Sequence, residues 1–304
     1  MPKPILVGYD AKTSDRAPVL FGVAAARFTG APLIIATVAA EPAADGQLED
    51  DLLADASAAL ARVGAELEPE GLEVDCRHLQ STSAARALHE TAERSDAGLL
   101  VVGSTRRGAV GRILPGSTAE RLMHGAPCAI AVVPHGWEPR GGIETVGVAY
   151  VQSPEGHEAL RSAHALARRA GATLRVLTVA KVGLAGYGET EATTADRRGL
   201  GFEEVEGHHR VQAEQRVRET VATLGDDVHV EVDGFLEDPA DTLIRVSENL
   251  DLLVVGSRGY GPLRAVLLGG VSRRVAAEAH CPVIVLPRGV QSSLEALMGD
   301  ATAA

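Results

Sequence analysis

The chain contains the same block of sequence twice, and this duplication requires a fold that can be built twice from similar pieces. Three segments of the first copy recur, in order, in the second copy. The matching pairs are residues 7–38 and 148–179, residues 99–104 and 252–257, and residues 126–134 and 279–287. The first pair is offset by 141 residues and the other two by 153, so the second copy carries a net insertion of 12 residues. Segment 181–207, which contains many Gly, Thr and Glu residues, is its expected position and is predicted to form a loop or lid.

Strands and helices are expected to alternate in the same order in both copies. Apolar runs such as ILVGY and TVGVAY are typical of buried strands. In the helical segment that follows, Pro18 lies in the first turn of the first copy, and Gly30 and Gly171 are the expected ends of the two helices. This alternation predicts an α/β fold, in which each copy forms a five-stranded parallel sheet with helices on both faces.

Length and charge limit the domain organisation and the partners. A chain of 304 residues is about twice the length of a typical domain. The expected division is a domain at 1–136, a linker at 137–142, a domain at 143–288 and a tail at 289–304. Aromatic residues form only 3% of the chain, so Val, Leu, Ile and Ala must build the core. The net charge of −12 argues against sequence-independent binding to nucleic acid or to an anionic membrane.

Cysteine usage and the start of the chain bear on its location. Cys76, Cys128 and Cys281 are an odd number of widely spaced cysteines, which fits a reducing compartment better than a disulfide framework. The start MPKPILVGYD lacks the regions of a signal peptide. A cytoplasmic location is therefore expected. Cys128 and Cys281 precede the last strand of each copy and are predicted to fill the core.

A glycine-rich loop follows a strand in each copy, GSTRRGAVGRILPGS at 103–117 and GSRGYGPLRAVLLGG at 256–270. Glycines let backbone N–H groups at a helix start approach phosphate oxygens closely. Neither loop is a GxxxxGK[ST] motif, because the only lysines are Lys3, Lys12 and Lys181. A GxGxxG motif is also absent after the first strands. Each loop is therefore either a phosphate site of another type or a tight turn that binds nothing.

With an aspartate at the end of the first strand and a late G-xx-G-(nine residues)-G-S/T loop, the chain resembles a tandem universal stress protein over about 1–136 and 143–288. The resemblance implies Rossmann-like or flavodoxin-like αβα sandwiches that pair within the chain through their final strands, and a homodimer of the whole chain. It also implies a stress-response protein. ATP-binding members hold adenine near the first-strand aspartate and the end of the second strand, and phosphates in the glycine loop.

Transferred residue by residue, the resemblance implies a nucleotide site in each copy for ATP or another adenine nucleotide, with or without Mg²⁺. The first site comprises Asp10, Val38, Gly103, Arg106, Gly108, Gly116 and Ser117. The second comprises Val179, Gly256, Gly259, Gly269, Gly270 and Ser272. No metal ligands and no catalytic residues are assigned.

Each copy departs from the family pattern. Arg106 stands where the pattern has a glycine, and the neighbouring arginines either pair with phosphate or form a solvated surface. In the second copy, Val151 aligns with Asp10, and Gly270 replaces the usual hydroxyl residue, with Ser272 as the expected substitute. The first copy is therefore the better expected site.

Three functions remain open from the sequence. The leading hypothesis is a regulatory protein that binds an adenine nucleotide, and the alternative is a scaffold that works without nucleotide. A slow ATPase is the least favoured, because no acid–base pair and no metal-binding acid is evident.

Overall fold

The computed structural model describes residues 2–13, 15–39, 47–67, 71–104, 117–180, 211, 214–215, 217–257, 269–287 and 297. The elements of the first half are β1 (Ile5–Gly8), α1 (Ala17–Thr29), β2 (Leu33–Ala39), α2 (Gln47–Leu67), β3 (Val74–Gln80), α3 (Ala84–Arg94), β4 (Leu99–Gly103), α4 (Ser117–Met123) and β5 (Ala129–Val133). The second half comprises β6 (Thr145–Ala149), α5 (Pro154–Ala170), β7 (Thr173–Ala180), β8 (Val230–Leu236), α8 (Pro239–Val246), a 3₁₀ turn at Ser247–Asn249, β9 (Leu252–Gly256), α9 (Gly270–Glu278) and β10 (Val283–Leu286). Strands and helices alternate in both halves, as the repeat predicts.

The expected helix ends are confirmed. Gly30 and Gly171 adopt left-handed backbone angles, with φ of 71° and 65°, directly after α1 and α5. Only glycine takes this conformation without strain, so each residue can stop its helix. None of the helices formed by described residues is both long enough and apolar enough to cross a membrane.

The two equivalent helices begin at different points. Ser153 caps α5 by accepting a hydrogen bond from Gly156 N at 3.1 Å, and Pro154 occupies the first turn. By the 141-residue offset, α1 begins about one turn later, at Ala17, with Pro18 next. Proline favours a place at the start of a helix over its interior, so Pro18 accounts for the later start.

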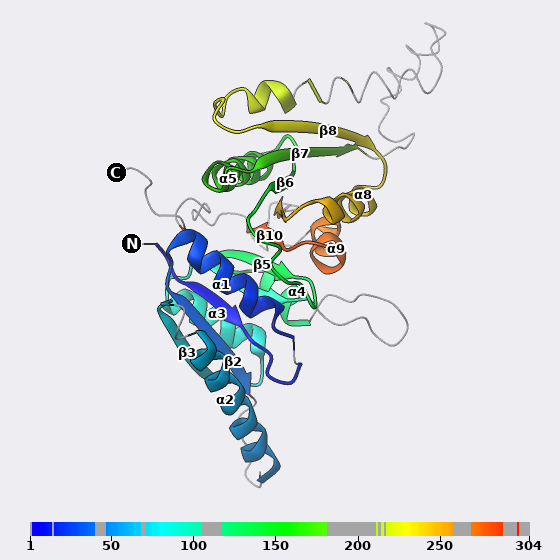
Figure 1. The fold of residues 1–304 in the computed structure, drawn as a ribbon. Coiled ribbons are helices and arrows are strands. Elements are labelled where there is room, and N and C mark those ends of the chain that lie inside the picture. The colour runs from blue at the N-terminus through cyan, green and yellow to red at the C-terminus, as the bar shows by residue number, and fades with distance from the viewer. Residues whose placement is uncertain are drawn as a thin grey trace, which may run out of the picture.

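The ten strands found among the described residues form one continuous sheet, in the order β3-β2-β1-β4-β5-β10-β9-β6-β7-β8. Pairing is parallel within each half, which confirms a five-stranded parallel sheet in each. β5 and β10 pair antiparallel at the centre, with Ile284 opposite Ala131. Figure 1 shows the two halves on either side of this central pair. Two copies that meet through the same edge, related by a two-fold rotation, must pair antiparallel there.

Two apolar clusters cover the two faces of the sheet, because successive strand residues point to opposite sides. Ile5 and Val7 belong to the cluster beneath α1, α2 and α5, whereas Leu6 belongs to the cluster beneath α3, α4, α8 and α9. Each cluster contains residues from both halves, so the halves share a core. Aliphatic side chains dominate both clusters, as the composition predicts.

Burial agrees with the packing role expected for two cysteines. Cys128 is 0% exposed and Cys281 is 3% exposed, and burial raises the pKa of each thiol to about 12. Cys76 lies on the edge strand β3 and is exposed. Its pKa is also raised, first by partial desolvation and then by the Asp75 carboxylate.

We expect an aryl disulfide reagent at pH 8 to modify Cys76 in the folded protein and to leave Cys128 and Cys281 unmodified. With a pKa of about 12, only about one buried thiol in ten thousand is a thiolate at that pH. Peptide mass spectrometry after timed labelling measures the three rates, and urea-unfolded protein, in which all three react, is the control. Equal labelling of Cys128 and Cys76 in the folded chain would contradict the packing role.

Candidate functional site

A cleft of about 470 Å³ lies at the carboxyl ends of β6, β7 and β9 in the second half. Its walls come from these strand ends, from the start of α5, and from α8 and α9. The described residues of the predicted second site all line it: Val179, Gly256, Gly269, Gly270 and Ser272. The remaining predicted residue, Gly259, lies outside the described residues. Parallel α/β sheets hold ligands at this edge, so the sequence prediction and the cleft coincide.

The start of α9 opens onto this cleft without a capping side chain. Gly269 is the residue before the helix, with extended backbone, and it cannot supply a cap. A Cβ atom at Gly270 would meet nothing within 4 Å, and the first turn of α9 contains no acidic residue. N–H groups in the first turn of a helix lack partners within the helix, and they favour anions. The helix start is therefore suited to an anionic ligand group.

Two glycines allow the start of α5 to pack against the strand ends. A Cβ atom at Gly156 would lie 1.9 Å from the carbonyl oxygen of Val151, and one at Gly256 would lie 3.0 Å from the carbonyl oxygen of Glu155. Both approaches are to backbone, which cannot swing aside. Gly156 and Glu155 line the cleft but are missing from the sequence prediction, although the cap residue Ser153 and Pro154 mark the helix start that brings them there.

The Ser272 hydroxyl makes a hydrogen bond within the protein. This hydroxyl donates a hydrogen bond to the Gly256 carbonyl oxygen at 3.1 Å, and the residue is only 8% exposed. This hydrogen bond occupies the only donor of the Ser272 hydroxyl, and it connects the first turn of α9 to the end of β9. Ser272 positions the helix start, and it offers a ligand only acceptor capacity.

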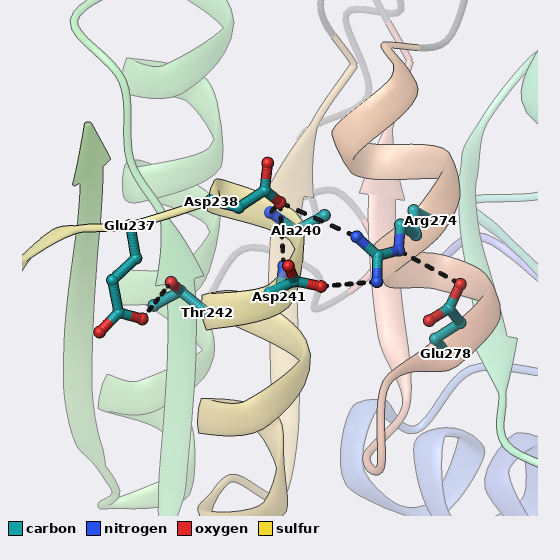
Figure 2. A network of polar contacts seen from close by, with 7 residues as sticks. All are labelled: Glu237, Asp238, Ala240, Asp241, Thr242, Arg274 and Glu278. Carbon is teal, nitrogen blue, oxygen red and sulfur yellow. Dashed lines mark hydrogen bonds and ion pairs between the residues drawn. The ribbon is translucent and has the colours of Figure 1, made fainter. Parts of the chain in front are cut away.

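A network of charged side chains also holds α9 against α8 (Figure 2). Arg274 Nη2 lies 2.6 Å from Asp241 Oδ1, and Arg274 Nε donates a hydrogen bond to Glu278 Oε1 at 3.3 Å. The hydrogen bond to Asp241 is the main cause of the raised pKa of Arg274. Asp238 caps α8 by accepting from Ala240 N at 3.0 Å. Exposed pairs contribute little singly but more as a network, so the network helps to fix the direction of α9.

The described part of the first site lies at the corresponding edge of the first half. Asp10 follows β1 and is exposed, Val38 lies near the end of β2, and Gly103 ends β4. The Asp10 carboxylate accepts a hydrogen bond from Lys12 N at 3.0 Å, which leaves further acceptor positions. Ser117 begins α4, although its side chain is not among those described. Arg106, Gly108 and Gly116 lie outside the described residues.

Sequence reasoning also missed a polar cluster beside Gly103. The Asp15 side chain is only 8% exposed, and its Oδ2 lies 2.9 Å from His135 Nδ1. Its Oδ1 accepts from Ala17 N and Gly136 N at 3.1 and 3.2 Å, and His135 N donates to Ser104 Oγ at 3.1 Å. Asp15 aligns with Gly156, so a buried carboxylate in one half replaces the close backbone contact of the other. No short-range sequence signal links Asp15 to His135.

Together, the sheet and its cleft define a tandem α/β protein of the class that holds ligands at the carboxyl ends of parallel strands. A family model described as the universal stress protein family matches residues 1–134 and 142–287. The chain belongs to the universal stress protein family.

The chain is also similar to individual proteins of known sequence or structure. A universal stress protein of Mycobacterium tuberculosis is 27% identical over 298 residues, which cover 93% of this chain and 99% of that protein. The crystal structure of a universal stress protein from Archaeoglobus fulgidus has a TM-score of 0.67 at 21% identity, covering 94% of this chain and 98% of that chain. A universal stress protein crystallised in complex with cAMP is 25% identical over 43% of this chain and 97% of that chain, with a TM-score of 0.34.

Proposed function

We propose that this stress-response protein binds ATP or a related adenine nucleotide in the cytoplasm as a regulatory module, with no robust enzymatic activity. The observation that carries the proposal is the second-half cleft, in which the uncapped start of α9 and the described residues of the predicted site meet. Its volume of about 470 Å³ falls in the range of small-molecule sites, about 300–1,000 Å³.

Residues of this cleft suit the parts of a nucleotide. The backbone N–H groups at the start of α9 would bind phosphate oxygens, because the helix dipole and the open space at Gly270 favour an anion there. Val179, which is half-buried, offers an apolar surface to the base. Among the described residues no group of three potential metal ligands occurs, so Mg²⁺ would be held chiefly through the phosphates.

The two halves would differ in strength. Asp10 offers carboxylate acceptors to the ribose or base in the first half, whereas Val151 offers none in the second. Glu155 adds a negative charge to the lining of the second cleft, which opposes phosphate binding. We therefore rank the first site above the second. Val151 and Glu155 also favour the alternative function, a scaffold with degenerate sites that acts without nucleotide.

The remaining organisation is proposed from the repeat and the family resemblance. The domains would be 1–136 and 143–288, and the whole chain would form a homodimer. Light scattering during size-exclusion chromatography measures the mass of the assembly.

We expect isothermal titration with ATP to show binding that Asp10→Ala weakens by about tenfold, because the change removes one charged hydrogen-bond acceptor. Gly270→Asp is expected to weaken the second site by a similar factor, because it adds a like charge at the start of α9. Asp55→Ala, an exposed carboxylate on α2, is the matched control.

Mass spectrometry of ligand released from the purified chain tests the same proposal without added nucleotide. No binding of ATP, ADP, AMP or cAMP, together with no released nucleotide, would overturn it and favour the scaffold.

A further inference from the structure

A second, larger cavity of about 630 Å³ lies between the two halves and shares no lining residue with the cleft of the second half. Its floor comes from strands of both halves and includes Ile5, Leu99, Leu252 and Ile284. Its walls are formed by α1, by Leu166 of α5, and by Trp137 and residues 139–143 in and after the linker. The cavity exists only because β5 and β10 join the halves, so neither half contains it alone.

The wall formed by α1 is unusually apolar. Within Ala17–Thr29 the only charged residue is Arg27, and the half-buried Leu20, Phe21 and Phe28 line the cavity. A helix that is apolar around its circumference is normally buried on all sides. The outer side of α1 instead borders this cavity, which leaves apolar surface for a ligand.

Two aromatic residues of α1 contact other segments beside the cavity. Phe21 packs edge-to-face against Trp137 of the linker, with ring centroids 5.6 Å apart. The Phe28 carbonyl oxygen accepts a hydrogen bond from Arg169 Nε at 3.1 Å, and the Arg169 guanidinium lies 5.5 Å from the Phe28 ring. Because Arg169 belongs to α5, this contact joins α1 to α5 at Phe28, which lines the cavity.

Negative groups around the cavity already have partners. Asp251 Oδ2 accepts from Glu144 N and Thr145 N at 2.8 and 2.9 Å. Glu248 Oε1 lies 3.5 Å from His280 Nε2. Each of these two carboxylates therefore has a partner beside it in the protein.

Positive groups at the same cavity retain donor capacity. Arg16 pairs with Glu66, yet its Nε is buried and has no hydrogen-bond partner within the described residues. Arg140 is exposed and makes no hydrogen bond or ion pair with any described residue. The lining thus combines an apolar body with donors suited to one anionic group.

We propose that this cavity binds a small amphipathic carboxylate, with its apolar body against Phe21, Phe28 and Trp137 and its carboxylate at Arg140. The volume of about 630 Å³ suits a medium-chain acid, because small-molecule sites measure about 300–1,000 Å³. This site is independent of the nucleotide proposal.

Dodecanoate, below its micelle concentration, is the probe. Trp137 is the only tryptophan in the chain, so its fluorescence reports on this cavity. We expect a saturable, single-site change in the full-length protein, and Arg140→Gln should weaken binding by about five- to tenfold. Arg86→Gln, an exposed arginine on α3, is the matched control and should change nothing. Dodecanol should bind less tightly than dodecanoate by about the same factor.

Two further variants separate the outcomes, with calorimetry as the readout. Ala24→Leu adds volume to the α1 wall and should abolish binding. Leu297 lines the cavity and is 3% exposed, so Leu297→Ser tests whether the C-terminal segment is the occupant. Binding that appears only in Leu297→Ser would overturn the proposal, as would absence of saturable binding, equal affinity for dodecanol, or an unchanged affinity in Arg140→Gln.

Discussion

Replacing Ile284 with aspartate is expected to lower the free energy of unfolding by about 3–5 kcal/mol at neutral pH. Ile284 is 3% exposed, lies in the central strand β10 and pairs with Ala131 of β5. A carboxylate there would lie among the apolar residues of the cavity floor, Ile5, Leu99 and Leu252. Because burial would raise the pKa of the introduced group, the part of the cost that comes from its charge should be absent below the ordinary pKa of about 4 and should grow as the pH rises toward the raised value. The loss of apolar contacts should remain at every pH.

Urea unfolding followed by circular dichroism, at pH 4 and pH 7, measures this loss. Cys76→Asp is the control, because Cys76 is exposed on the edge strand β3 and its replacement should cost little. An equal loss in both variants, or a loss that does not depend on pH, would show that the centre of the sheet does not hold the halves together.

Gly156→Ala is expected to destabilise the protein by about 3 kcal/mol, because overpacking against rigid structure costs this much. The added Cβ would lie 1.9 Å from the Val151 carbonyl oxygen, so the start of α5 or the end of β6 must move. Both segments line the second-half cleft. Any ligand of that cleft should therefore bind more weakly, even under conditions in which the variant is folded.

Gly270→Ala is the matched control for this change. Gly270 also lies in the first turn of a helix at the same cleft, but a Cβ there meets nothing within 4 Å. Stability should stay the same or rise by up to about 1 kcal/mol, because alanine favours helix more than glycine does. Thermal unfolding of the two variants gives the comparison, and equal melting temperatures would refute the steric argument.

Much of the fold follows from the sequence because local signals agree in both copies. Apolar runs mark the strands, and Gly30 and Gly171 mark the helix ends. The continuity of the sheet is harder to predict from the residues themselves, since the same apolar final strands fit either two separate sheets or one. The family resemblance, and not the apolar pattern, implies pairing through those strands.

The candidate site was predictable in outline and not in detail. Glycine spacing in the loop identifies Gly256, Gly269 and Gly270. Of these, Gly256 lies in close contact with backbone, because a Cβ atom there would be 3.0 Å from the Glu155 carbonyl oxygen. The bond from Ser272 to Gly256 and the packing of Gly156 on Val151 depend on where each helix starts, to within a fraction of a turn. Tertiary packing sets the start of each helix, and the spacing of residue types along the sequence does not determine it.

The covalent duplication allows the two proposed nucleotide sites to differ in affinity. In an assembly of two identical chains, every substitution appears in both sites at once. Here Asp10 lies at the proposed first site and Val151 lines the cleft of the second half, and both follow strands of one continuous sheet. Under the proposed function, one chain would respond over two ranges of nucleotide concentration. The first site would be occupied at low concentration, and the second site only when the concentration rises further.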